Sequence, residues 1–182
     1  MRCKVGIALV VLMPLGLFGQ SPITLIDASR VGDWDEVKRL MDEGVSIDAR
    51  DDSKWGYSAL HWAIRAKDAE RTARLLALGA NPDVRAAWDS ETPLHVASAQ
   101  CNLEGTLLLL AARAAINARD DDDWTPLHFA INSRCSFVVT ALIDGGADLN
   151  ARYSRDKSSS AINLAKRRSS YIFDLLKDAG AR

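Results

Sequence analysis

The sequence predicts an all-α solenoid of stacked helix-turn-helix units, mainly because it contains an internal repeat of about 33 residues. An apolar pair followed by glycine, such as Leu75-Leu76 before Gly79, recurs in phase with a second pattern, Leu/Ile-x-x-Ala. That second pattern occurs at Leu25/Ala28, Leu60/Ala63, Leu94/Ala97, Leu127/Ala130 and Ile162/Ala165. Repeats of this length stack because one unit cannot bury its own apolar face.

Each unit contains start and stop features for two helices. Thr92-Pro93 and Thr125-Pro126 begin a first helix, since threonine is a good N-cap and proline suits the first helical position. The second helix carries the apolar pair and ends at a glycine that can adopt the left-handed conformation. These glycines are Gly44, Gly79, Gly146 and Gly180. Arg113 replaces the glycine in one unit, which makes that helix end the least defined.

The repeat motifs identify a family resemblance. The segments Thr92–Ala97 (TPLHVA), Thr125–Ala130 (TPLHFA) and Gly146–Ala151 (GADLNA) strongly resemble the ankyrin repeat family. Tetratricopeptide units have a similar length, but the Thr-Pro-Leu-His motif and the missing Trp and Tyr pattern of that family argue against them. The resemblance covers Leu25 to the C-terminus. It implies short β-hairpin-like fingers and a concave groove that binds a protein partner.

The domain organisation follows from the repeat register. We expect three full repeats at 54–87, 88–120 and 121–153, between an N-terminal capping repeat at 21–53 and a C-terminal capping repeat at 154–182. The first unit lacks the histidine, and Lys177 replaces an apolar residue in the last. Polar replacements of this kind keep the exposed ends of a stack soluble.

Residues 1–20 are predicted to be a signal peptide. Arg2 and Lys4 precede an uncharged apolar segment from Val5 to Phe18, followed by small and polar residues near the expected cleavage at Gly19 or Gln20. This segment is shorter than the roughly 20 residues that cross a bilayer, so stable membrane insertion is not expected. The protein is therefore predicted to be exported, either periplasmic or secreted.

Charge and cysteine content give two further expectations. The 23 basic and 24 acidic residues nearly cancel, so the overall balance does not indicate a nucleic-acid partner. Cys101 and Cys135 could form a disulfide in an oxidising compartment. However, their register places them on neighbouring repeats and one position out of equivalence, where packed helices are about 8–10 Å apart. Two partly buried thiols are the preferred interpretation, and a disulfide is the alternative.

Three residue series have both functional and structural interpretations. His61, His95 and His128 recur in phase, so they are spread along the stack and a role in backbone hydrogen bonding is favoured over a shared metal site. The run 120–123 consists of aspartates but lacks the spaced ligands of a calcium loop, so a solvated finger tip is favoured. A solvated ladder of arginine–carboxylate pairs is favoured over a partner-facing strip for Arg50, Arg85, Arg119 and Arg152.

The fingers carry the candidate binding residues, because aromatic side chains beside charges are typical of binding hot spots. The predicted aromatic anchors are Trp55, Tyr57, Trp88, Trp124 and Tyr153. The predicted charged rim is Asp89, Glu91, Asp121, Asp122 and Asp123. The alternative is that Tyr57 and Trp124, which directly precede an N-cap, pack on their own repeats.

The sequence predicts a non-catalytic protein that binds another protein through its groove and fingers. No catalytic, cofactor-binding or metal-binding residues are predicted, because no catalytic constellation stands apart from the repeat-phased positions. A structural or self-assembling module and a secreted effector or inhibitor that blocks an enzyme remain as alternatives. The sequence does not specify the oligomeric state.

Overall fold

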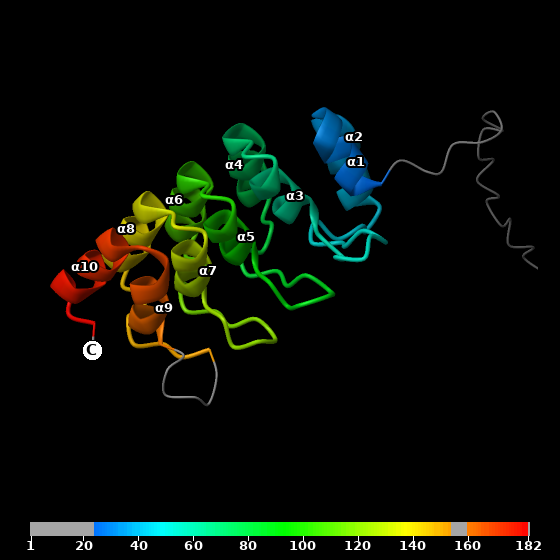
Figure 1. Cartoon of the computed structure of the whole chain (residues 1–182). Helices are drawn as coiled ribbons and strands as arrows, with labels where there is room; N and C mark the ends of the chain where they lie inside the picture. Colours follow the sequence, from blue (N-terminus) through cyan, green and yellow to red (C-terminus); the bar gives the residue numbers. More distant parts are fainter. Residues whose placement is uncertain (1–23, 154–159, 182) are drawn as a thin grey trace, which may run out of the picture.

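The computed structural model describes residues 24–153 and 160–181, and within these ranges the chain forms five consecutive helix pairs (Figure 1). The first helices of the pairs are α1 (Leu25–Val31), α3 (Ala59–Arg65), α5 (Pro93–Ala99), α7 (Pro126–Asn132) and α9 (Ala161–Arg168). The second helices are α2 (Trp34–Asp42), α4 (Ala69–Ala77), α6 (Leu103–Ala111), α8 (Ser136–Asp144) and α10 (Ser170–Asp178). The predicted signal peptide lies outside the described residues.

The helix pairs stack into a curved row. First helices contact first helices, from α1 through α3, α5 and α7 to α9, and second helices α4, α6, α8 and α10 form the adjacent layer. The connections between pairs project to one side of the row as long loops (Figure 1). In the described part of the chain, β-structure is limited to the isolated bridges Arg50–Ser58 and Arg152–Ser160. The predicted all-α solenoid is confirmed.

The recurring alanines explain how closely the first helices pack. Each first helix carries the alanine of the Leu/Ile-x-x-Ala pattern, and a methyl group allows the neighbouring helix to approach. All five alanines are fully buried: Ala28, Ala63, Ala97, Ala130 and Ala165. The leucine or isoleucine three positions earlier is also buried in each unit, so one apolar core runs the length of the stack.

The second helices end in the left-handed conformation that the sequence predicts. The φ angles of Gly44, Gly79, Gly146 and Gly180 lie between 86° and 93°. Arg113, at the corresponding position after α6, adopts a φ of 63°, and the Ala114 N–H still donates to the Leu109 carbonyl at 3.0 Å. This helix therefore ends like the others despite the missing glycine.

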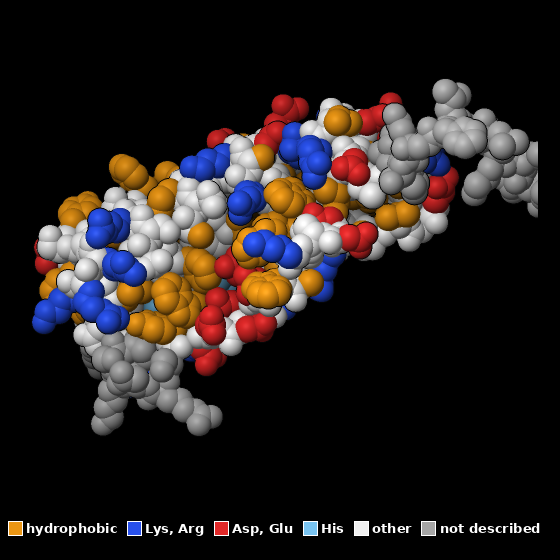
Figure 2. Space-filling model, turned by 45° about the vertical axis from the view of Figure 1, so that its right-hand side comes forward, with side chains coloured by type: hydrophobic (Ala, Val, Ile, Leu, Met, Phe, Trp, Pro, Cys, Tyr) orange, Lys and Arg blue, Asp and Glu red, His pale blue; other side chains and the backbone are white. Residues whose placement is uncertain are grey.

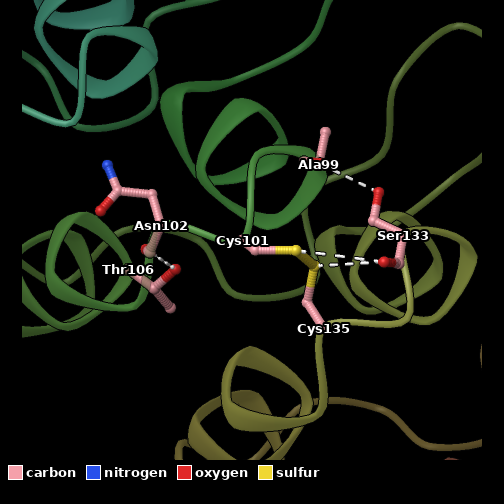
Figure 3. The surroundings of a disulfide bond; sticks show 6 residues. All are labelled: Ala99, Cys101, Asn102, Thr106, Ser133 and Cys135. Atoms are coloured by element: carbon pink, nitrogen blue, oxygen red, sulfur yellow. Dashed lines mark hydrogen bonds between the residues drawn. A yellow bond between two sulfur atoms is a disulfide. The ribbon is translucent and has the colours of Figure 1, made fainter.

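Cys101 and Cys135 form a disulfide, so the prediction of two separate thiols is wrong (Figure 3). Their Cα atoms are 5.3 Å apart, which is within the range that a disulfide requires. The distance between helix axes was a poor guide because neither cysteine lies inside a helix. Cys101 occupies the turn between α5 and α6 with a φ of 53°, and Cys135 is the N-cap of α8.

Candidate functional site

Three of the connections between helix pairs, 50–58, 84–92 and 118–125, lie wholly within the described residues, and backbone hydrogen bonds close each of these fingers. The Asp51 N–H donates to the Tyr57 carbonyl at 2.9 Å, and the Ala86 N–H to the Glu91 carbonyl at 2.8 Å. In the third finger the Asp120 N–H donates to the Trp124 carbonyl at 3.0 Å. These bonds fix each loop before any partner is present.

Neighbouring fingers are also bonded to one another. The Ala87 N–H donates to the Trp55 carbonyl at 2.9 Å, and the Asp121 N–H donates to the Asp89 carbonyl at 3.0 Å. Gly56 permits the first of these contacts, because an added Cβ would lie 2.3 Å from Ala87 Cβ. The three fingers therefore form one continuous surface.

The predicted aromatic anchors differ in exposure. Trp88 is 69% exposed, whereas Trp55, Trp124 and Tyr153 are half-buried. Tyr57 is 3% exposed, because its ring stacks on the buried His61 ring at a centroid distance of 4.9 Å. The expectation that Tyr57 presents its ring to a partner is therefore wrong. For this residue the alternative, packing on its own repeat, is correct.

Side chains from the second and third fingers line a hollow of about 310 Å³, which we call the acidic hollow. Acidic and apolar side chains lie next to one another on this face of the molecule (Figure 2). Trp88 and Trp124 line the hollow together with Phe129 of α7 and four carboxylates. The carboxylates are Asp89, Glu91, Asp120 and Asp122.

Burial and mutual repulsion perturb two of these carboxylates. Burial, followed by the nearby charges of Asp89 and Asp120, raises the pKa of Glu91 to about 7. Burial also raises the pKa of Asp120, although its carboxylate accepts hydrogen bonds from the backbone N–H groups of Trp124 and Asp122. The hollow therefore concentrates negative charge where solvation is reduced.

Half of the ten predicted anchor and rim residues line this hollow: Trp88, Asp89, Glu91, Asp122 and Trp124. The predicted anchors Trp55, Tyr57 and Tyr153 do not. Asp121 and Asp123 do not line the hollow, and Asp123 instead pairs with Arg119 at 3.6 Å. Sequence reasoning missed Asp120 and Phe129. Asp120 is part of the aspartate run 120–123, which the sequence predicts to be a solvated finger tip. Phe129 is part of a first helix, where the sequence predicts that an aromatic residue is buried in the core.

A second hollow of about 320 Å³ lies on the other side of Trp124 and carries the opposite charge. It is lined by Trp124, Tyr153, Leu164, Arg167 and Arg168. Arg167 Nη2 donates to Tyr153 Oη at 3.0 Å, which holds that tyrosine beside the arginines. We call this the basic hollow. The predicted anchors Trp124 and Tyr153 thus border a basic surface as well as an acidic one.

The three histidines hold the fingers from beneath. In α3, α5 and α7, the backbone N–H of the N-cap residue donates to histidine Nδ1, so the neutral ring carries its proton on Nε2. That Nε2–H donates across the repeat boundary at 3.1 Å, to the carbonyl of Glu91 from His61, of Trp124 from His95 and of Ala151 from His128. These hydrogen bonds explain why histidine recurs at the same position of three successive repeats. Across residues 24–153 and 160–181, no cluster of His, Cys, Asp or Glu suits a metal ion.

The arginine ladder bonds mainly to backbone, which differs from the predicted arginine–carboxylate ladder. Arg85 Nη1 donates to the Arg119 carbonyl at 2.8 Å, and Arg119 Nη1 donates to the Arg152 carbonyl at 2.7 Å. Arg85 and Arg119 thus reach the next arginine of the series, 34 and 33 residues further on. Asp89 and Asp123 each lie four residues after one of these arginines, and of the two only Asp123 forms an ion pair, with Arg119 at 3.6 Å, among the described residues.

Repeated helix pairs, finger loops and histidines that bridge repeats define an α-solenoid. Comparison with known protein families identifies the same class. The family model for ankyrin repeats (3 copies) matches residues 25–120 and 70–153. The chain belongs to the ankyrin repeat family. Ankyrin repeats generally mediate protein–protein interaction, and the family is typically non-catalytic.

Several curated proteins are similar over about three quarters of this chain. SH3 and multiple ankyrin repeat domains protein 2 of Homo sapiens is 32% identical over 135 residues, covering 74% of this chain and 7% of the human protein. An ankyrin repeat protein of Rickettsia bellii is 29% identical over 146 residues, covering 76% and 41%. Glycerophosphocholine phosphodiesterase gde1 of Schizosaccharomyces pombe is 34% identical over 139 residues, covering 71% and 12%. The chain thus spans less than half the length of each relative.

A helix that crosses a membrane needs about 20 predominantly apolar residues. Within residues 24–153 and 160–181, no helix is both long and apolar enough to cross a bilayer.

Proposed function

We propose that this protein is an exported, non-catalytic binding protein that holds a protein partner in its groove and against its fingers. The observation that carries the proposal is Trp88, a large aromatic side chain that is 69% exposed beside a charged hollow. Tryptophan is enriched in the hot spots of protein interfaces, where it is buried on binding. The bonds between fingers support this role, because a prearranged surface loses less entropy when it binds.

The disulfide supports the export part of the proposal. Disulfides persist in oxidising compartments such as the periplasm and the extracellular space, and they are rare in the cytosol of most organisms. Cys101–Cys135 joins two repeats, and a cross-link of this kind suits a protein that works outside the cytoplasm. Cell fractionation tests this part, and full-length protein confined to the cytosol would contradict it.

A crosslinking pull-down from the exported fraction tests partner binding. We expect Trp88→Ala to lose most of the captured partner, because an exposed anchor is removed without disturbing the core. Phe137→Ala is the matched control, since Phe137 is 76% exposed but lies on α8, away from the fingers. Equal capture by wild type and Trp88→Ala would refute the finger surface. If only Phe137→Ala loses the captured partner, the result would indicate that the interface lies on the second helices.

A further inference from the structure

We infer that the acidic hollow between Trp88 and Trp124 receives an arginine side chain of the protein partner. This inference rests on the proposed function and names the chemistry that one part of the binding surface recognises. Three observations carry it: carboxylates without a direct ion pair among the described residues, two tryptophan rings that no described cation covers, and carboxylate oxygens held in place by the backbone.

The carboxylates of the hollow form no ion pair with a described cation. Burial and the nearby charges of Asp89 and Asp120 raise the pKa of Glu91 by more than the charge of Arg65 lowers it. The Tyr57 Oη also donates to Glu91 Oε2 at 3.5 Å. Among the described residues, no ion pair within 4.0 Å involves Asp89, Glu91, Asp120 or Asp122. Acidic side chains elsewhere on the surface do form such pairs, for example Asp68 with Arg71 at 3.1 Å. Clustered acids that no cation pairs with directly repel one another, and a bound cation relieves that repulsion.

The tryptophan rings differ in whether a cation of the chain lies over them. The chain's own cations cover three of its five tryptophan rings: Lys54 over Trp55 at 4.3 Å, Arg74 over Trp34 at 4.8 Å and Arg30 over Trp62 at 5.7 Å. In the described part of the chain, no cation lies over Trp88 or Trp124. These two rings are the tryptophans that line the acidic hollow. A cation stacked on an aromatic face is stabilising, more so when it is partly desolvated.

Backbone donors hold the carboxylates in fixed positions. Asp89 Oδ1 accepts the Glu91 N–H at 3.1 Å, and Asp120 Oδ1 accepts the N–H groups of Trp124 at 2.7 Å and Asp122 at 3.0 Å. No hydrogen bond to Oδ2 of either aspartate comes from another described residue. The second oxygen of each side chain is thus available to an incoming donor, with little entropy left to lose.

An arginine side chain fits this combination better than a metal ion. A guanidinium stacks flat on an aromatic ring and donates in its own plane to carboxylates on both sides. Calcium and magnesium require a shell of oxygen ligands, whereas aromatic rings form much of this wall. The volume of about 310 Å³ is sufficient for one long side chain.

A direct binding experiment on the isolated protein tests the inference. The full mature chain is labelled with 5-fluorotryptophan, its five ¹⁹F resonances are assigned with Trp→Phe variants, and Nα-acetyl-arginine methylamide is titrated in. We expect saturable shifts of the Trp88 and Trp124 resonances, with those of Trp34, Trp55 and Trp62 unchanged. The neutral analogue Nα-acetyl-citrulline methylamide should produce no saturable shift. Equal binding of the two probes would overturn the inference.

Charge variants separate the hollow from general negative charge. We expect the double variant Glu91→Gln, Asp122→Asn to weaken arginine-probe binding about tenfold, since two of the four acidic groups that line the hollow are made neutral. Asp121→Asn is the matched control, because Asp121 lies on the same finger but does not line the hollow. Equal weakening by the control would overturn the inference, and thermal melts of each variant confirm that it is folded.

The inference and the proposed function can fail independently. If Trp88→Ala loses the partner in the pull-down while the double charge variant keeps it, the finger surface stands and the arginine pocket is wrong. If the probe binds as expected but capture of a partner does not depend on Trp88, the pocket stands and the proposed interface is wrong.

Discussion

The boundary between the first and second repeats and the boundary between the third and fourth are held together in different ways. At the first boundary, Ile26 occupies the position that histidine occupies in the next three repeats, and its side chain has no donor for the next repeat's carbonyl. The neighbouring Asp27 carboxylate accepts from the Thr24 hydroxyl at 2.7 Å within its own repeat. The side-chain hydrogen bonds that cross there include the exposed Arg71 Nη2 to the Arg30 carbonyl at 2.9 Å and the part-buried Trp62 Nε1 to Asp51 Oδ2 at 2.7 Å.

The inner boundary, between α5 and α7, carries stronger links. His95 Nε2 donates to the Trp124 carbonyl, Ser133 Oγ donates to the Ala99 carbonyl at 2.9 Å, and the disulfide joins the two turns (Figure 3). The acidic hollow spans this same boundary, since Trp88 and Trp124 come from its two sides. In a stacked repeat, stability depends on such nearest-neighbour interfaces. The comparison teaches that the candidate binding surface lies over a boundary with more buried and covalent links than the first one.

Acid should produce the largest loss of stability, because it acts on the histidines that the first boundary lacks. Burial lowers the pKa of His61, His95 and His128 to about 4, from an ordinary value of 6.5. The unfolded chain therefore binds protons first as the pH falls below 6.5, and the stability contributed by the neutral rings is lost between pH 6.5 and 4. Glu91 opposes this, since its raised pKa makes the folded state gain stability as the pH falls from 7 to 4.5.

The net expectation is a loss of about 5 kcal/mol in the free energy of unfolding between pH 7 and pH 4.5, with three histidines outweighing one glutamate. Urea unfolding followed by circular dichroism at the two pH values measures it. Glu91→Gln sharpens the test, because removing the opposing group should make the acid-induced loss larger. Constant stability over this range would show that the histidines are not held neutral.

Replacing His95 should weaken the inner boundary by about 3 to 4 kcal/mol. In His95→Ala the Thr92 N–H and the Trp124 carbonyl lose their partner in a buried position, and a cavity remains. The comparison change at the first boundary, Arg71→Ala, removes the exposed hydrogen bond to the Arg30 carbonyl and the pair with Asp68, and should cost about 1 kcal/mol. Chemical denaturation of both variants checks the difference. Similar costs would mean that the two boundaries are equally strong.

The features that recur at the same position of each repeat could be predicted from the sequence. The features that depend on how closely two loops approach each other could not. Helix caps, buried alanines and histidines follow from local chemistry at a fixed spacing, so the solenoid could be predicted. The disulfide could not, because the distance between Cys101 and Cys135 depends on how two turns approach each other. Tyr57 and Trp55 are neighbours with similar composition around them, and only the folded fingers show which ring is buried.

Reducing the disulfide should have the smallest of these effects, about 3 kcal/mol, by removing a cross-link between residues 34 apart in sequence. The reduced protein should stay folded at neutral pH, because the hydrogen bonds of His95 and Ser133 across the same boundary do not depend on the cysteines. Thermal melts with and without reductant measure the change, and Cys101→Ser, Cys135→Ser should melt like the reduced protein and ignore the reductant. If the double variant still responds to reductant, or if reduction leaves the wild-type melting temperature unchanged, the greater strength of the inner boundary does not come from its cross-link. The arginine-probe titration also measures whether the disulfide affects binding. Because Trp88 and Trp124 flank this boundary, reducing the disulfide should lower the affinity for the arginine probe, whereas a change at the first boundary should not.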